Sequence, residues 1–286
     1  MALKAGAIRF NTDTSQMEIW DGNQWTGILA TSPEQQTGGT RGVFGGGSRP
    51  SPSTRNVVDF ANLDSTGNFT DFGDLIQARS QLGGTASRSR GLFIGGFFNP
   101  STRNEIDFIT IASTGTVTDF GNITQSRTGC ASVSNGTRAF QFAGLTNLGP
   151  VHSNIIHTTT IATLGDAVKF GELTIAPDAH AGSGNQVRGL SWCGQTPSNI
   201  NNIEYFELAS EGNGVDFGDA SAAKDYLGAV ASSTRGLCGG GQTPTKINVI
   251  DYVQIATIGN ATDFGDLTVA RRFCAGFSDV HGGLAS

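Results

Sequence analysis

Hydrophobic and polar residues alternate in short runs along the chain, and most runs end at glycine, asparagine or aspartate. The runs are rich in Thr, Val, Ile and Phe, which are the residue types that favour strands. A sustained three-to-four-residue spacing of apolar positions, which would indicate an amphipathic helix, is not found. The chain has 286 residues, of which 41 are glycine, and glycine is common in tight turns. The pattern therefore predicts an all-β protein built from short strands.

One segment recurs five times with nearly constant spacing. The copies read TRGVFGGG, SRGLFIGG, TRAFQFAG, VRGLSWCG and TRGLCGGG, and their arginines are Arg41, Arg90, Arg138, Arg188 and Arg235. Successive arginines are 49, 48, 50 and 47 residues apart. A glycine-rich stretch can also cradle a phosphate, but these copies lack the Lys-Ser/Thr pair of a P-loop and open no helix pattern. We therefore interpret the glycines as turns of a repeated unit.

Three further segments keep the same phase. A strand-like segment begins at Asn56, Asn104, Asn154, Asn201 and Asn248. The next segment carries one phenylalanine per unit: Phe72, Phe120, Phe170, Phe217 and Phe264. A last segment, rich in small residues, begins at Ala78, Ser126, Ala176, Ala223 and Ala270. Four short strands in about 48 residues are typical of a propeller blade, and we expect the recurring phenylalanine to be buried between neighbouring units.

The repeat resembles the kelch repeat. A double glycine that ends one strand, an aromatic residue in the next strand and a later aromatic residue match that pattern between residues 40 and 278. Phenylalanine stands where kelch repeats usually carry tryptophan, so the family is a divergent one. The resemblance implies a five-bladed kelch-like β-propeller over residues 37–286. The segment from Ala270 to Ser278 is a surplus strand, and we expect it to complete the first blade, because a closed ring has no open sheet edge.

Residues 1–36 have a different pattern. Apolar and polar positions alternate in two short runs, which contain Ile8, Phe10, Met17 and Ile19. Together with the turn residues between them, these runs predict a small β-meander of three strands. A meander of this size cannot bury two tryptophans by itself. We therefore expect it to dock on a partner through four apolar residues: Ile8, Phe10, Trp20 and Trp25.

The stretch GAIRFNTDTSQMEIWDGNQW, which begins at Gly6, resembles a short module of fibre, neck and appendage proteins of tailed bacteriophages. With the repeats behind it, nearly the whole chain resembles structural proteins of cyanobacterial phages. The resemblance implies a virion fibre, neck or tail appendage subunit that is made in the host cytoplasm, forms a homo-oligomer and binds other virion structural proteins. The alternative is a receptor-binding, lectin-like adhesion protein that recognises a host surface glycan.

Composition excludes several partners. Lysine and arginine total 18 against 24 acidic residues, a net charge of −6, which argues against binding to nucleic acid or an anionic membrane. No apolar stretch is long enough to span a bilayer, and the first residues lack the apolar region of a secretory signal. The four cysteines show no CxxC spacing, so we expect reduced thiols rather than a zinc site or a disulfide framework.

No combination of acid, base and nucleophile indicates catalysis, and we expect no enzymatic activity, cofactor or metal. A copper-radical oxidase, which some kelch-like propellers form, needs a Tyr, His and Cys constellation that nothing in the sequence brings together. One repeat position could form a ring around a hard cation, but a solvated or turn-bonding strand position is the favoured interpretation; its residues are Asp59, Asp107, His157, Glu204 and Asp251. We expect His180 to fill a slot in an inner strand.

A glycan site on the loops between strands needs aromatic rings for stacking and polar groups for hydrogen bonds. Two places offer both. The candidate contacts are Phe97, Phe98, Asn99, Trp192 and Gln195. Because these loops are short, ordinary turn packing is the favoured interpretation of the same residues.

Overall fold

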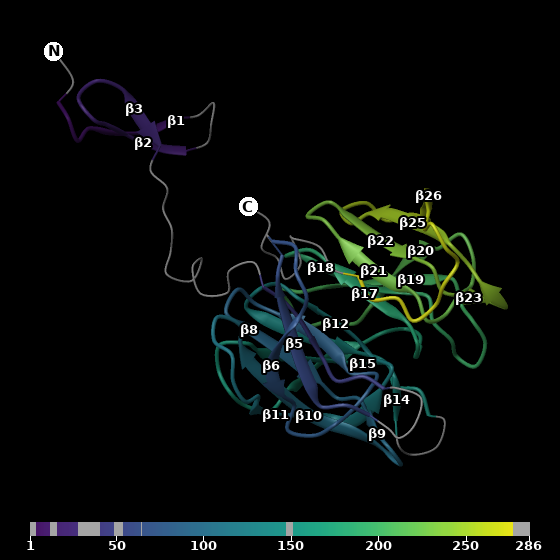
Figure 1. The fold of residues 1–286 in the computed structure, drawn as a ribbon. Coiled ribbons are helices and arrows are strands. Elements are labelled where there is room, and N and C mark those ends of the chain that lie inside the picture. Colours follow the sequence, from purple (N-terminus) through teal and green to yellow (C-terminus); the bar gives the residue numbers. More distant parts are fainter. Residues whose placement is uncertain are drawn as a thin grey trace. The chain divides into compact units, whose positions relative to one another are not determined.

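The computed structural model describes residues 4–11, 16–27, 41–48, 54–63, 65–146 and 151–276. The chain divides into two compact units, Met1–Thr37 and Gly38–Ser286, which are described separately. Within the described residues, every regular element is a β-strand and none is a helix (Figure 1). No helix in this part of the chain could therefore cross a membrane. The predicted all-β class is confirmed.

The first unit contains a three-stranded antiparallel sheet in the order β1-β2-β3. Its strands are β1 (Ile8–Asn11), β2 (Gln16–Trp20) and β3 (Trp25–Gly27). The turn between β2 and β3 forms because the Asp21 carboxylate accepts the backbone N–H groups of Asn23 and Gln24, at 2.7 and 2.8 Å. This is the local bonding that makes aspartate a turn residue.

The second unit consists mainly of five antiparallel sheets. The first sheet is β4 (Arg41–Gly45), β5 (Val57–Asn62) and β6 (Thr70–Asp74). The second is β7 (Gly83–Ala86), β8 (Arg90–Ile94), β10 (Ser101–Thr110) and β11 (Thr118–Thr128), with β9 (Phe97–Phe98) and β14 (Leu145–Thr146) at its margin. The third is β12 (Ala131–Ser134), β13 (Arg138–Phe142), β15 (Ile155–Thr160) and β16 (Val168–Glu172).

The fourth sheet is β17 (Ala181–Gly184), β18 (Arg188–Trp192), β19 (Asn202–Glu207) and β20 (Val215–Asp219). The fifth is β21 (Gly228–Ala231), β22 (Arg235–Gly239), β25 (Val249–Gln254) and β26 (Thr262–Asp266). Between β22 and β25 the chain forms a separate small hairpin of β23 (Gln242–Thr243) and β24 (Thr245–Lys246).

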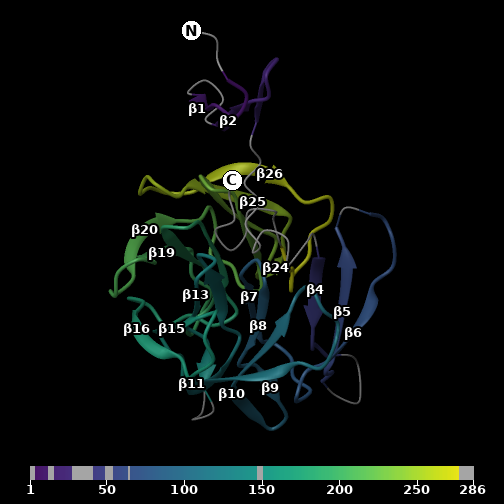
Figure 2. The same cartoon turned by 90° about the vertical axis from the view of Figure 1, so that its left-hand side faces the viewer.

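The sheets follow one another around a common centre (Figure 2). Strands β7, β12, β17 and β21 begin the second to fifth sheets, and they contact one another in that order. Each of these innermost strands comes from the last segment of one sequence repeat, whereas the other strands of its sheet come from the next repeat. A sequence repeat is therefore divided between two sheets. This radial arrangement of antiparallel sheets makes the fold β-propeller-like.

The recurring phenylalanine is a bulged residue. In the second sheet Ile106 pairs with Gly121 and Asp107 pairs with Asp119, so Phe120 has no opposite partner. The same register shift occurs in the other four sheets. There the residues without an opposite partner are Phe72, Phe170, Phe217 and Phe264. A bulge bends its strand and redirects the extra side chain. Here it turns four of the five phenylalanines into the space between sheets.

Apolar clusters fill the four spaces between consecutive sheets. The first to fourth phenylalanines of the repeat lie in these clusters, with exposed fractions of 4, 3, 4 and 1%. Their predicted burial is confirmed. The fifth, Phe264, is 51% exposed, so the prediction is wrong for this residue in the structure described. The reason is that Phe264 lies on a face of the fifth sheet that belongs to none of the four clusters.

The predicted surplus strand from Ala270 to Ser278 is described up to Gly276, and its last two residues lie outside the described part. Residues 270–276 contain no strand, but their backbone is fixed against the fifth sheet. The Gly241 N–H donates to the Arg271 carbonyl at 2.8 Å, and the Phe273 N–H donates to the Tyr226 carbonyl at 2.8 Å.

Candidate functional site

The N-terminal sheet exposes apolar side chains on one face. Ile8 lies opposite Ile19, and Phe10 lies opposite Met17. Residues that face each other across two strands share a face, and so do residues two apart. Ile8, Phe10 and Met17 are exposed and, with the half-buried Ile19, form what we call the Ile8–Met17 face. A unit of fewer than about 40 residues buries too little apolar surface to form a stable core by itself, so this face is the strongest candidate for docking.

The opposite face holds the two tryptophans. Their rings pack edge to face with centroids 5.5 Å apart, and the Arg9 guanidinium lies 4.2 Å from the Trp25 ring centroid. Arg9 also pairs with Glu18 at 2.8 Å. Hydrogen bonds from Asn11 and Arg9 lower the pKa of the Glu18 carboxyl.

This arrangement places the four predicted docking residues on two different faces of the sheet. Trp20 and Trp25 lie on the face opposite Ile8 and Phe10, as the strand register requires. There they are half-buried against each other and stabilise the meander. Met17, which sequence reasoning left out of the set, completes the exposed face. Its signal was present in the alternation, because Met17 keeps the same parity as Ile19 along β2.

The repeated acidic position forms buried pairs with basic residues. Arg79 contacts Asp107 at 2.9 Å, and Lys224 contacts Asp251 at 2.6 Å. In the third sheet the Arg127 guanidinium donates to His157 Nδ1 at 2.9 Å. In the fourth sheet, where Pro177 replaces the basic residue, Glu204 instead accepts hydrogen bonds from three groups: the Thr174 N–H and hydroxyl and the Ile175 N–H, at 2.7, 2.9 and 3.0 Å.

These pairs overturn the interpretation of the column as solvated. Asp107, His157, Glu204 and Asp251 are buried, and Asp59 is half-buried. Each buried member has its partner on the segment just before its own sheet. Within the described residues, no three His, Cys, Asp or Glu side chains are grouped so that they could hold a metal ion. In the second to fifth sheets, the column therefore ties the segment that leads into the sheet to that sheet's third strand.

Burial shifts the pKa values of this network. Desolvation raises the pKa of Asp107 and lowers that of Arg79, although each is partly compensated by the other's charge. Desolvation lowers the pKa of Arg127 to about 10, which leaves it charged at neutral pH. Desolvation, with the charge of Arg127, lowers the pKa of His157 to about 3. His157 is therefore neutral, and its Nδ1 accepts the bond from Arg127.

Sequence reasoning missed the basic partners. They are Arg79, Arg127 and Lys224, all at the second position of the last segment of a repeat. The signal was the recurrence of a basic residue there, with Arg271 as a further copy and Pro177 as the exception. Their partners lie 27 to 30 residues later, in the next repeat unit, so the pairing could not be read from a single unit.

The arginines of the repeat connect consecutive sheets. The guanidinium groups of Arg41, Arg90, Arg138 and Arg188 donate to carbonyls of the following sheet, namely those of Ile111, Ile161, Leu208 and Ile255, at 2.8, 2.9, 3.4 and 2.9 Å. Each guanidinium also lies near an aromatic ring of its own sheet, such as Phe60 for Arg41, at 4.7 Å. Charge-assisted bonds of this kind are among the stronger hydrogen bonds in proteins.

The candidate glycan contacts do not form one surface. Phe97 and Phe98 are half-buried in β9 of the second sheet, and Asn99 is exposed beside them. Gln195 lies between β18 and β19 of the fourth sheet and donates to Asp178 at 3.5 Å. Trp192 is fully buried and donates its indole N–H to the Ser183 hydroxyl at 2.8 Å. Trp192 therefore offers no surface for stacking, and its prediction as a glycan contact is wrong.

His180 occupies the interior, as predicted. Its ring lies 5.5 Å from that of Phe142, and burial lowers its pKa to about 3. The four cysteines, Cys130, Cys193, Cys238 and Cys274, are free thiols. Burial raises the pKa of Cys130, which disfavours the reactive thiolate.

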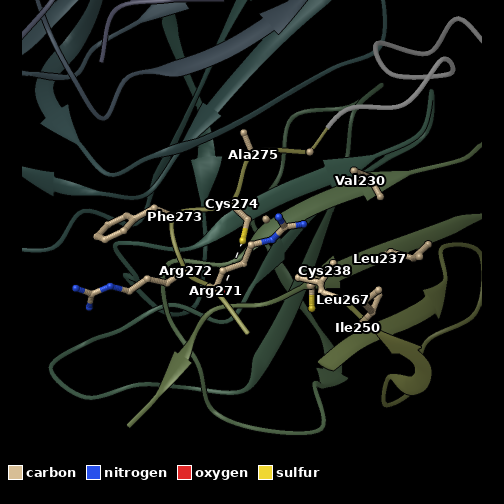
Figure 3. A pocket seen from close by; sticks show the side chains of 13 residues that line it. Val230, Leu237, Cys238, Ile250, Leu267, Arg271, Arg272, Phe273, Cys274 and Ala275 are labelled. Atoms are coloured by element: carbon tan, nitrogen blue, oxygen red, sulfur yellow. Dashed lines mark hydrogen bonds between the residues drawn. The ribbon is translucent and has the colours of Figure 1, made fainter. Parts of the chain in front are cut away.

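A cavity of about 420 Å³ lies between the fifth sheet and the segment Arg271–Gly276 (Figure 3). Leu237, Ile250 and Leu267 line it from one side, and Cys238 and Cys274 contribute thiols. The apolar lining is that of an uncovered sheet face rather than of a site with convergent polar groups.

Comparisons with known proteins support the fold. No protein-family model matches this chain, and no curated protein matches it. Among solved structures, the one entitled "Structure of YjhT" is similar with a TM-score of 0.64 and 10% sequence identity, over 78% of this chain and 81% of that chain. A likeness at this low identity bears on the fold alone, and it supports the β-propeller-like architecture.

Proposed function

We propose that this chain is a structural subunit of a tailed-phage virion, in a fibre, neck or tail appendage. Its N-terminal module docks to other virion proteins, and residues 37–286 form a five-bladed kelch-like propeller that is an exposed, rigid body. The observation that carries the proposal is the Ile8–Met17 face, an apolar surface on a sheet too small to bury it. Exposed apolar faces on otherwise polar modules mark interaction sites.

The inter-sheet contacts support the structural role of the second unit. The buried pairs Arg79–Asp107 and Lys224–Asp251 and the arginine bonds between sheets use the charged residues of the repeat to hold the sheets together. This use of the polar residues favours a rigid body over a catalytic site. The proposal therefore assigns no enzymatic activity, cofactor or metal to the chain.

The innermost strands support a five-bladed form. Strands β7, β12, β17 and β21 occupy four successive places around the centre, and the segment Arg271–Gly276 lies next to β21. We propose that this segment leads into the innermost strand of the first sheet. The first sheet has three strands in the part of the chain that is described, so a fourth from the C-terminal segment would make it like the others.

The docking role is tested by particle reconstitution. Particles that lack this protein are incubated with purified full-length chain or with Ile8→Ser, and bound protein is quantified by immunoblot. Ile258→Ser is the matched control, because Ile258 in the second unit is as exposed as Ile8, at 56 and 58%. We expect Ile8→Ser to lower occupancy at least tenfold and Ile258→Ser to leave it unchanged. Equal occupancy of Ile8→Ser and the wild type would contradict the assignment.

Receptor binding is the alternative function. The half-buried rings of Phe97 and Phe98 beside the exposed Asn99 are the observation that favours it. A glycan array probed with the purified protein separates the two functions. A structural subunit binds no glycan at micromolar concentration, whereas a host-glycan receptor protein binds a related group of glycans, and Phe98→Ala weakens that binding.

A further inference from the structure

Two sheet faces of the second unit are exposed although their counterparts in the repeat are covered. On the fifth sheet, Phe264 is 51% exposed, whereas the four equivalent phenylalanines are at most 4% exposed. On the first sheet, Leu63 is 52% exposed, whereas its equivalents are at most 8% exposed; they are Ile111, Ile161, Leu208 and Ile255. Phe264 lies on the side where a following sheet would pack, and Leu63 lies on the side where a preceding sheet would pack.

In the described part of the chain, hydrogen bonds that recur between successive sheets are missing at the same two faces. The N–H groups of Gly115, Gly165 and Gly259 donate to the carbonyls of Phe72, Phe120 and Phe217 in the preceding sheet, at 2.9, 2.8 and 2.8 Å. By the repeat offset, Gly67 is the donor that matches the Phe264 carbonyl. Among the described residues these two groups make no such bond. Likewise, Arg235 is the donor that matches the Leu63 carbonyl.

Within the described ranges, the recurring ion pairs also lack one member at these two faces. In the second and fifth sheets, a basic residue before the innermost strand pairs with an acid on the third strand, as Arg79 does with Asp107 and Lys224 with Asp251. The same offset matches Arg271 with Asp59 of the first sheet. The backbone of Arg271 already has the position that this pair requires. Its carbonyl accepts the Gly241 N–H at 2.8 Å, just as the Arg79 and Lys224 carbonyls accept the N–H groups of Gly47 and Gly194, both at 2.9 Å.

We propose that the face of the fifth sheet that carries Ile250, Phe264 and Leu267 binds the face of the first sheet that carries Leu63 and Phe69 of the same chain, with Arg271 and Asp59 as a buried ion pair at this joint. The inference rests on the five-bladed propeller proposed above, and it identifies the joint that closes the ring. The cavity in Figure 3 is the space that the joint fills, since Ile250 and Leu267 line it.

The occupant is the first sheet of the same chain rather than a second copy. The residues at both faces are the missing members of contacts that recur between successive sheets of this one chain. Arg271 is also fixed at the fifth sheet by two backbone bonds, from the Gly241 N–H to its carbonyl and from its own N–H to the Ile247 carbonyl. A segment tethered in this way meets its own chain at a high effective concentration. Binding within the chain therefore precedes binding between chains.

Thermal unfolding of the full-length chain tests the joint. Arg271→Ala is compared with Arg272→Ala, since both arginines are exposed in the structure described and only Arg271 belongs to the proposed pair. Phe264→Ala is compared with Val269→Ala in the same way. We expect Phe264→Ala to lower Tm by about 10 °C, as for a buried phenylalanine in a domain of this size, and Arg271→Ala to lower it by several degrees. Val269→Ala is expected to stay within about 1 °C of the wild type. Arg272→Ala, which loses an exposed hydrogen bond to Gln242, is expected to lower Tm by less than Arg271→Ala.

Charge reversal keeps the test decisive where single variants fold poorly. Asp59→Arg and Arg271→Asp each place like charges at the joint, and the double variant Asp59→Arg/Arg271→Asp restores the opposite pair. Recovery of at least half of the lost Tm in the double variant supports the pair. Additive losses, or Tm values of Phe264→Ala and Arg271→Ala equal to those of their controls, would overturn it.

Light scattering distinguishes the source of the covering face. A monomer that shows these stability losses supports closure within the chain. A dimer that Phe264→Ala converts to monomer would show that a second copy covers the face, and it would overturn the proposal. Both measurements use purified protein, so their failure is distinguishable from failure of the virion assignment, which depends on particle occupancy.

Discussion

The contribution of the bulged phenylalanine can be measured at Phe217. Its side chain is 1% exposed in the cluster between the fourth and fifth sheets, and its ring packs edge to face on Tyr205 at 5.8 Å. Phe217→Ala removes a buried ring whose surroundings are held by strands on both sides, so little collapse of the cavity is expected. Large-to-small changes of this kind cost about 3–5 kcal/mol. At about 2–4 °C per kcal/mol for a large domain, that free energy lowers Tm by roughly 6–20 °C.

The assay is denaturant unfolding followed by far-UV circular dichroism, with Tm from calorimetry. Val215→Ala is the control, because Val215 lies two residues earlier on β20 and is exposed. Its expected cost is below about 0.5 kcal/mol. A cost of less than about 1 kcal/mol for Phe217→Ala would refute the conclusion that the bulge buries this ring between sheets.

Three further outcomes are expected. Because burial lowers the folded-state pKa of His180 from 6.5 to about 3, its contribution to stability is present above pH 6.5 and is lost as the pH falls towards 3; between pH 7 and pH 4 it amounts to roughly 3 kcal/mol. His180→Leu, which introduces the residue of the equivalent positions Leu82 and Leu227, should reduce the acid-induced loss of unfolding free energy by that amount, and an unchanged loss would contradict the burial argument. Deletion of residues 268–286 should give an aggregating or poorly folded protein, whereas a soluble truncation with a cooperative melt would count against the role of this segment in the ring. Deletion of residues 1–36 should leave a soluble, β-rich protein that no longer assembles on particles lacking the native chain, and normal occupancy of that truncation would place the attachment surface on the second unit.

The strands and their order could be predicted from the sequence because each repeat states its pattern five times. The alternation around Ile8 and Phe10 likewise indicated the exposed face of the N-terminal sheet. The bulge at each phenylalanine could not be predicted, since it is a property of how two strands pair and not of either strand alone. The pairing of Arg79 with Asp107 was missed for a similar reason, because the two residues belong to different repeats and meet only when the sheet has formed.

The burial of Trp192 was within reach of the sequence. In the equivalent strands of the second and third sheets this position holds Ile94 and Phe142, both apolar and both fully buried. The comparison of columns across repeats therefore indicated a core position, whereas the tryptophan considered by itself suggested a ligand contact. For the N-terminal tryptophans no second copy exists to compare, so only the structure showed that they pack on each other.

The division of each sequence repeat between two sheets has a consequence for how the second unit was able to change in size. If one segment of about 48 residues were duplicated or lost, each junction between sheets would keep the same construction, because the innermost strand of the second to fifth sheets always comes from the segment that precedes that sheet. The number of units is therefore not encoded in the joints themselves. It depends on the angle between successive sheets, so a single recombination event that adds or removes one segment would change the number of sheets while each joint kept the same construction.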